Sequence, residues 1–202
     1  MTEKIMKIYI IANGDYNYSS QLDGVVICAD GGANNYKNAP DFVIGDMDSI
    51  DRELLAEYQL NDKVKVIIDK DQNKTDLELA IELAQTLKPD EIIILGAIGD
   101  RMDHTFGNLA CLSKFDGKIK IEDNKQEIFL VSDYIEIIGK IGDTISIIPL
   151  NEVKSLTYTG LEWNVENKNV EFGWLGVCNK LISEKATIKL KSGKILVIRI
   201  KN

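Results

Sequence analysis

The hydrophobic positions of this chain follow two different rhythms along its length. In the first half, short apolar runs rich in β-branched residues alternate with longer helical patterns. Alternation of strands with helices predicts an α/β N-terminal domain with a mostly parallel sheet whose two faces are covered. The strands expected in this half cover residues 7–12, 24–29, 42–44, 64–68 and 91–95.

The clearest helical pattern in the first half covers residues 75–87. Thr75 suits the N-cap position, Glu78 would complete a capping box, and Pro89 ends the pattern. A second helix is predicted over 102–114. The apolar residues that share one face of the first helix are Leu77, Ala80, Ile81, Ala84 and Leu87.

After about residue 122 the helical period disappears, and short β-type runs are separated by Asp, Gly and Asn. This pattern is typical of an all-β sandwich or barrel, and Lys191–Lys194 looks like the tip of a terminal hairpin. We therefore predict an α/β domain over 1–124 and a β-sandwich domain over 125–202. The strands expected in the second half cover residues 127–131, 134–138, 144–149, 153–158, 186–190 and 195–200.

Composition narrows the classes of protein. The 24 basic and 32 acidic residues give a net charge of -8, which argues against a partner such as nucleic acid or an anionic membrane surface. No apolar run approaches the length of a membrane helix, and Met1–Lys7 lacks the pattern of a secretory signal. Three scattered cysteines without a C-x-x-C pair indicate reduced thiols and no structural zinc. We expect a cytoplasmic protein.

Polar motifs follow the predicted strands, where ligands bind in open α/β sheets. The glycines of Ala29–Asn34 would let backbone approach a phosphate or ribose, although a plain tight turn fits equally well. Asp46 and Asp48, two residues apart, could reach one Mg²⁺ together. Alternatively, Asp48 or Ser49 caps the helix expected after them.

Two further loops carry charge. Residues 69–76 hold several acids, and Asp76 could either complement a helix dipole or face a metal shared with the other acids. Since clustered carboxylates repel one another without a cation, the metal interpretation is favoured. Arg101 suits phosphate contact, with a surface ion pair as the alternative. His104, the only histidine, is expected to be an ordinary hydrogen-bonded side chain, and no hydrolytic triad is recognisable.

Four segments within residues 28–104 occur in an order that resembles the thiamine pyrophosphokinase family. They read CADGGANN, DFVIGDMDSI, DKDQNKTDLELAI and LGAIGDRMDH, and Gly176–Asn179 with the β-rich tail is similar to the family's thiamine-binding domain. The resemblance implies transfer of pyrophosphate from ATP to the thiamine hydroxyl, which gives thiamine diphosphate and AMP. It also implies Mg²⁺ as cofactor and a homodimer with shared active sites.

The resemblance assigns expected roles to individual residues. Catalytic roles fall on Asp46, Asp48, Asp76, Arg101 and Asp103. Metal ligation falls on Asp46, Asp48 and Asp76. Since Mg²⁺ usually takes only one or two protein carboxylates, Asp71 is expected to be an outer or spare acid. Nucleotide contacts fall on Asn13, Asp30, Gly31, Gly32, Ala33 and Arg101. Thiamine contacts fall on Cys178, Asn179 and Asp103.

The chain departs from the family pattern at three places. Asp100 stands where the family usually has Gly, Cys178 replaces a Ser, and Asn164 replaces a Pro. Two other classes of function stay open. A Mg²⁺-dependent phosphohydrolase or sugar-nucleotide transferase would use the same acidic loops and act without thiamine. A non-catalytic nucleotide-binding module would bind AMP or ATP without turnover.

Overall fold

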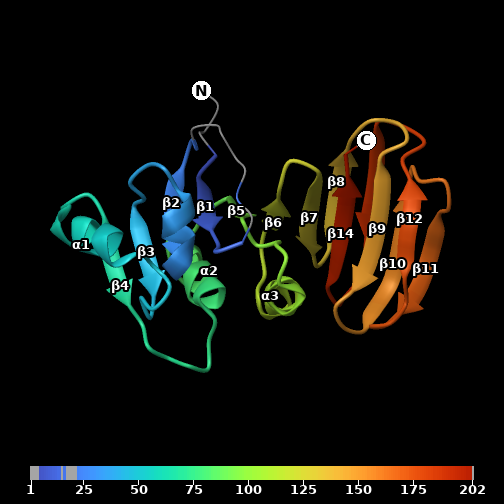
Figure 1. The fold of residues 1–202 in the computed structure, drawn as a ribbon. Helices are drawn as coiled ribbons and strands as arrows, with labels where there is room; N and C mark the ends of the chain where they lie inside the picture. The colour runs from blue at the N-terminus through green and yellow to red at the C-terminus, as the bar shows by residue number, and fades with distance from the viewer. Residues whose placement is uncertain (1–4, 15, 17–21, 202) are drawn as a thin grey trace. The chain divides into compact units, whose positions relative to one another are not determined.

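A computed structural model describes residues 5–14, 16 and 22–201 of the chain (Figure 1). The chain divides into two compact units, and each is described by itself. The first comprises residues 1–111 and 121–123, and the second comprises 112–120 and 124–202. The predicted absence of a signal segment rests partly on residues 1–4, which lie outside the described residues. The domain boundary at 124/125 stays a prediction.

The first unit contains a parallel sheet, as predicted, and its strands follow the order β5-β1-β2-β3-β4 (Figure 1). Its central strands are apolar on both faces because both faces are covered, and Ile8, Ile27 and Ile94 are fully buried. The strands are β1 Lys7–Ile11, β2 Val25–Ala29, β3 Phe42–Gly45, β4 Lys65–Ile68 and β5 Glu91–Leu95.

The helices begin near the carboxyl ends of these strands. Thr75 is the N-cap of α2, as predicted, and its hydroxyl accepts a hydrogen bond from the Glu78 amide at 3.2 Å. The apolar face of α2 packs against β1, β2 and β3. The helix expected over 102–114 is α-helical at first and tightens into a 3₁₀ turn at its end. The helices are α1 Arg52–Leu60, α2 Asp76–Thr86, α3 Met102–Cys111, η1 Asp30–Asn35 and η2 Leu112–Lys114.

The second unit is an antiparallel β-sandwich, as predicted. One of its sheets has the order β12-β9-β14-β7, and the other has the order β11-β10-β13-β8. Ile145, Leu156 and Val197 are fully buried in its core. The strands are β7 Gln126–Val131, β8 Tyr134–Ile138, β9 Thr144–Pro149, β10 Val153–Thr159, β11 Val165–Val170, β12 Gly176–Lys180, β13 Lys185–Lys189 and β14 Ile195–Ile200.

The predicted terminal hairpin around Lys191–Lys194 is wrong. Strand β13 pairs with β10 and β8, whereas β14 pairs with β7 and β9, so the connection crosses from one sheet to the other. A turn signal specifies a reversal of the backbone but not the sheet that receives the next strand. The sequence also missed β6 (Ile119–Glu122), β11 and β12. In β11 only Val170 is buried, so its residues lack a hydrophobic alternation.

Among the described residues, every helix is too short or too polar to traverse a bilayer.

Candidate active site

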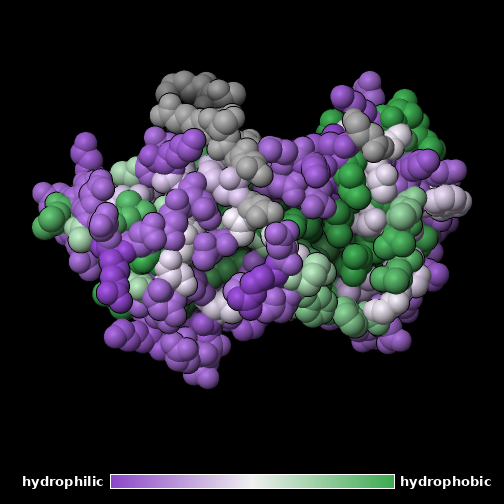
Figure 2. All heavy atoms as spheres, viewed as in Figure 1, coloured by the Kyte–Doolittle hydropathy of each residue, from purple (hydrophilic) through white to green (hydrophobic). Residues whose placement is uncertain are grey.

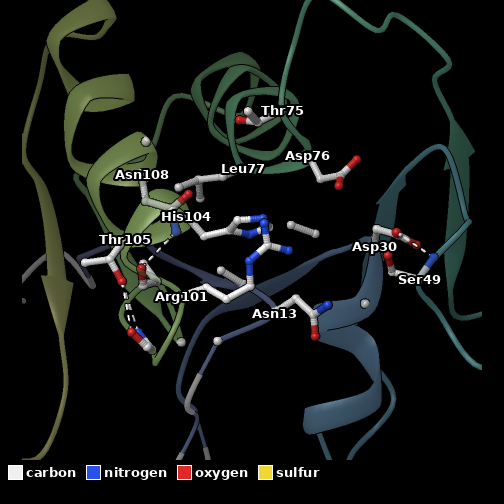
Figure 3. Close-up of a pocket in the computed structure, with 18 of the residues that line it drawn as sticks. Asn13, Asp30, Ser49, Thr75, Asp76, Leu77, Arg101, His104, Thr105 and Asn108 are labelled. Carbon is white, nitrogen blue, oxygen red and sulfur yellow. Dashed lines mark hydrogen bonds between the residues drawn. The ribbon is translucent and has the colours of Figure 1, made fainter.

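Loops at the carboxyl edge of the first unit's sheet surround a cavity of about 770 Å³ (Figure 3). Most of the residues predicted for catalysis and for nucleotide and metal binding line it: Asn13, Asp30, Gly31, Asp46, Asp48, Asp71, Asp76, Arg101 and Asp103. Gly32 and Ala33 are buried in η1 beside the cavity and do not line it. A Cβ on Gly32 would lie 2.1 Å from the Ile11 carbonyl oxygen, so this glycine permits close packing of η1 on β1.

Asp30 is a buried acid that fixes the neighbouring acidic loop. It is 1% exposed, and its carboxylate accepts hydrogen bonds from the backbone amides of Ser49 at 3.0 Å and Ile50 at 3.2 Å. Burial raises the pKa of Asp30, and the two amide donors oppose that rise. Its backbone has a φ of 40°, which is uncommon for a residue with a side chain. Asp30 therefore shapes the loop that carries Asp46 and Asp48.

Carboxylates from different strand ends converge in the cavity. Oxygen atoms of Asp30, Asp46 and Asp48 lie within 4.8 Å of one another. A Cβ on Gly45 would be 2.7 Å from a carboxylate oxygen of Asp76, so the absence of a side chain at this position lets Asp76 approach the same place. The carboxylates of Asp30, of Asp46 with Asp48, and of Asp76 belong to three separate loops in the sequence and are thus neighbours in the fold.

The helix-capping alternative for the Asp46–Ser49 loop is wrong. Asp51 is the N-cap of α1, and the Ser49 hydroxyl instead donates a hydrogen bond to Asp48 at 2.7 Å. The side chain of Gln72, which the sequence did not single out, donates to Asp46 at 3.3 Å. Both carboxylates of the loop are therefore oriented by side-chain donors.

Asp76, the first residue of α2, has a raised pKa because it is partly buried beside these other carboxylates. Burial raises its pKa from 3.8 to about 6, and the charges of Asp30, Asp46 and Asp48 add to the rise. A divalent cation would remove this repulsion. A donor set made only of carboxylate oxygens fits a hard cation such as Mg²⁺ and not a metal that prefers thiolate or imidazole.

Asp71 differs from the other predicted metal ligands in its contacts. Its carboxylate accepts hydrogen bonds from the backbone amide of Asn73 at 3.0 Å and from the side-chain amide of Asn73 at 2.8 Å. These donors lower the pKa of Asp71. The side chain lines the cavity, but one of its oxygens is already used within its own loop.

Arg101 and Asp103 form a two-point ion pair at the start of α3, with distances of 3.2 and 2.5 Å. The arginine lowers the pKa of Asp103 to about 2. Both side chains are exposed, so solvent screens the pair. Figure 3 shows Arg101 and His104 projecting into the cavity. Arg101 thus forms the surface ion pair that was the alternative to phosphate contact, and its guanidinium still lies at the cavity.

Two polar residues of α3 that the sequence did not single out hold the preceding loop. The hydroxyl of Thr105 is 3.2 Å from both the amide and the carbonyl of Gly99, and Asn108 donates to the Ala97 carbonyl at 2.8 Å. Their signal in the sequence was weak, because it consists only of two polar residues three positions apart on a predicted helix. They position the loop from which Arg101 projects.

Asn13 lies at the end of β1 and contacts the glycine loop. A Cβ on Gly31 would be 2.4 Å from the Asn13 side-chain nitrogen. Gly31 is therefore the residue that lets the Asn13 amide lie across the start of η1. Both residues face the cavity, as Figure 3 shows for Asn13.

The residues expected to contact thiamine are divided between the units. Asp103 belongs to the first unit, whereas Cys178 and Asn179 belong to the second. Asn179 is 4% exposed, and its side chain exchanges hydrogen bonds of 3.0 and 2.6 Å with the backbone of Trp163. The Trp163 side chain is 59% exposed. Cys178 is exposed, has a φ of 61°, and its amide donates to Ser146 at 3.2 Å. Asn179 thus holds the turn that presents an exposed tryptophan.

Comparisons with known proteins agree over both units. Residues 18–125 match the family model for the thiamin pyrophosphokinase catalytic domain, and residues 125–195 match that for its vitamin B1 binding domain. Thiamine pyrophosphokinase 1 of Oryza sativa is 31% identical over 85% of this chain and 76% of its own length. Thiamine pyrophosphokinase of Bacillus subtilis is 29% identical over 95% of this chain and 97% of its own length. A crystal structure of the Bacillus subtilis protein superposes with a TM-score of 0.82 at 25% identity and covers 97% of this chain and 99% of its own.

Proposed function

This chain belongs to the thiamine pyrophosphokinase family, and we propose that its acidic cavity carries the transfer of pyrophosphate from ATP to the hydroxyl of thiamine. The products are thiamine diphosphate and AMP. Membership of the family makes the chain an enzyme of the transferase class that acts in thiamine diphosphate synthesis. The competing functions, a nucleotide phosphohydrolase or a binding module without turnover, are not favoured by these relatives.

One observation carries the proposal: carboxylate oxygens from separate loops lie within 4.8 Å of one another in a cavity that Arg101 also lines. Transfer of a phosphorus group needs positioning and charge neutralisation more than covalent chemistry from the protein. Asp46, Asp48 and Asp76 would hold Mg²⁺, with Asp71 in an outer position. The bound cation would supply charge neutralisation at the phosphates. Asp30 acts indirectly, through its hold on the loop of Asp46 and Asp48.

Arg101 and Asp103 have separate tasks in this proposal. The guanidinium of Arg101 binds phosphate oxygens, for which its planar set of donors is suited. Asp103 would orient thiamine, as the family resemblance implies. A carboxylate of the cavity would accept the proton of the thiamine hydroxyl. Asn13 and Gly31 contact the nucleotide where η1 begins.

The second unit would supply the remaining contacts to thiamine through Cys178 and the turn that Asn179 holds. We also propose a homodimer in which the active sites are shared. Trp163, Phe172, Leu175 and Val177 are all exposed on the second unit, and such apolar side chains suit burial against a second copy. Figure 2 shows apolar side chains gathered on the visible face of this unit. The cytoplasmic location stays a prediction.

The reaction is tested by incubating the protein with ATP, Mg²⁺ and thiamine and separating the products. AMP and thiamine diphosphate should form in equal amounts, without ADP. Asp46→Asn and Asp48→Asn should each lower turnover at least roughly a hundredfold, because a catalytic metal contributes several kcal/mol. Formation of ADP with thiamine monophosphate, or release of phosphate without thiamine, would contradict the proposal.

The shared site is tested by mixing inactive variants. Asp46→Asn impairs the first unit, and Asn179→Ala impairs the turn of the second. If each active site combines units from two copies, unfolding and refolding the two variants together should restore part of the activity that each lacks alone. Light scattering of the wild-type protein supplies the control. An active monomer at assay concentration would refute the shared site.

A further inference from the structure

The cavity has many acids and few basic side chains to receive a polyphosphate. Among the described residues that line it, the lysine and arginine side chains are those of Lys74 and Arg101. Arg101 is already paired with Asp103. The positive charge that side chains of the cavity offer to the four negative charges of ATP is therefore small, and the position of Lys74 becomes important.

The ammonium of Lys74 is paired with a residue outside the cavity. Its ammonium lies 2.9 and 2.8 Å from the two carboxylate oxygens of Glu82, which is on α2 and does not line the cavity. The side chains are 34% and 43% exposed. Ion pairs of this exposure are weak and exchange readily with other partners. The pair with Glu82 is therefore a position that Lys74 can leave.

The backbone of Lys74 is fixed close to the catalytic acids. Its amide donates to the Asp71 carbonyl at 3.1 Å, and the next residue, Thr75, caps the helix that begins with Asp76. A flexible four-carbon stem ending in a compact charge can sweep several ångströms from this fixed point. The ammonium can thus move from Glu82 towards the cavity without any change of backbone.

We propose that Lys74 is a further nucleotide-binding residue, which exchanges Glu82 for the polyphosphate of ATP when the nucleotide enters. This inference rests on the proposed function, because it concerns the same cavity and the same nucleotide. Glu82 is a competitor for the ammonium and keeps it from pairing with the metal-binding acids in the empty enzyme. Neutralising Lys74 and neutralising Glu82 should therefore change nucleotide affinity in opposite directions.

The test is calorimetric titration of the whole protein with Mg²⁺ and α,β-methylene ATP, which cannot transfer pyrophosphate, and separately with AMP. Lys74→Met should weaken binding of the analogue about tenfold, the low end for a hydrogen bond to a charged group. Lys74→Arg should retain most of the affinity. Glu82→Gln should strengthen binding about threefold, the scale of an exposed ion pair. AMP, which lacks the β- and γ-phosphates, should be affected little.

A double-variant cycle separates release of Lys74 from a general change of charge. Glu82→Gln should have little effect once Lys74→Met is present. Lys70→Met, in the same loop but outside the cavity, is the matched control for loss of one positive charge. Equal effects of Lys74→Met on the analogue and AMP, or a full gain from Glu82→Gln without Lys74, would overturn the proposal.

The titration also separates this proposal from the proposed function. If the wild-type protein binds the analogue but forms no thiamine diphosphate, the proposed reaction fails while the variants still decide the role of Lys74. If the wild-type protein binds no analogue, both proposals fail.

Discussion

Asp76→Asn is expected to make the metal-free protein more stable while it removes activity. The substitution preserves size but removes one carboxylate from a cluster with Asp30, Asp46 and Asp48. The pKa of Asp76 is raised from 3.8 to about 6, mainly by burial. Such a rise corresponds to about 3 kcal/mol of unfavourable free energy when the group is ionised. Because Asp76 is only partly buried, we reduce the expected gain in stability to about 1–2 kcal/mol.

The sign of the pH dependence follows from the protons bound in each state. Between pH 4 and pH 6 the folded protein keeps the proton of Asp76 while the unfolded chain has lost it. Stability is therefore favoured at the acid end of this window and falls as the pH rises through about 6. In Asp76→Asn this fall should be absent, so the two proteins should differ at pH 8 and converge near pH 4.

The measurement is urea unfolding in EDTA at several pH values, followed by the same series with excess Mg²⁺. Mg²⁺ should raise the unfolding free energy of the wild-type protein more than that of the variant, because a ligand stabilises the state that binds it. Asp62→Asn is the control, since Asp62 is exposed and lies outside the cavity. The reasoning is refuted if Asp76→Asn is no more stable than the wild type at pH 8 in EDTA, or if their difference does not depend on pH.

Three other substitutions test single contacts. Gly31→Ala should raise the KM for ATP about tenfold, since the new Cβ would lie 2.4 Å from the Asn13 amide and must displace it; steady-state kinetics with an unchanged KM would contradict this. Arg199→Met should lower the free energy of urea unfolding by about 3 kcal/mol, because it removes the guanidinium that lies 2.8 Å from the carboxylate of Asp143, a residue that is 1% exposed; a loss below about 1 kcal/mol would contradict it. Thr105→Val should lower kcat roughly tenfold and lower the free energy of unfolding by about 1 kcal/mol, because it frees the loop at the start of α3. A loss of stability with unchanged kcat would show a structural role alone.

The order of elements in the first unit could be predicted because its determinants are local. The apolar runs of β1, β2 and β5 are long enough to mark strands buried on both faces. Thr75 marks the start of α2 because an N-cap is a property of neighbouring residues. The acids follow the ends of predicted strands in the sequence. Their meeting place could therefore be predicted, because parallel strands bring their carboxyl ends to one edge of the sheet.

The second unit shows where local patterns fail. Strand β11 is mostly exposed, so it carries no alternation that would reveal it. The connection between β13 and β14 contains a good turn signal, yet the two strands belong to different sheets. Strand pairing depends on which partner edge is free in space, and the residues of the turn do not encode that choice.

Sequence alone thus determined the two kinds of domain, the acidic strand ends and the resemblance to one enzyme family, since each is written in neighbouring residues or ordered motifs. Only the tertiary structure decided that Asp30 turns to the amides of Ser49 and Ile50, and that Lys74 rests on Glu82. Each contact joins residues that are separated along the chain, and the direction of a side chain depends on the donors, acceptors and charges that the fold brings within hydrogen-bonding distance. Spacing in a sequence can bring such groups to one edge of a sheet, but it does not choose among their partners.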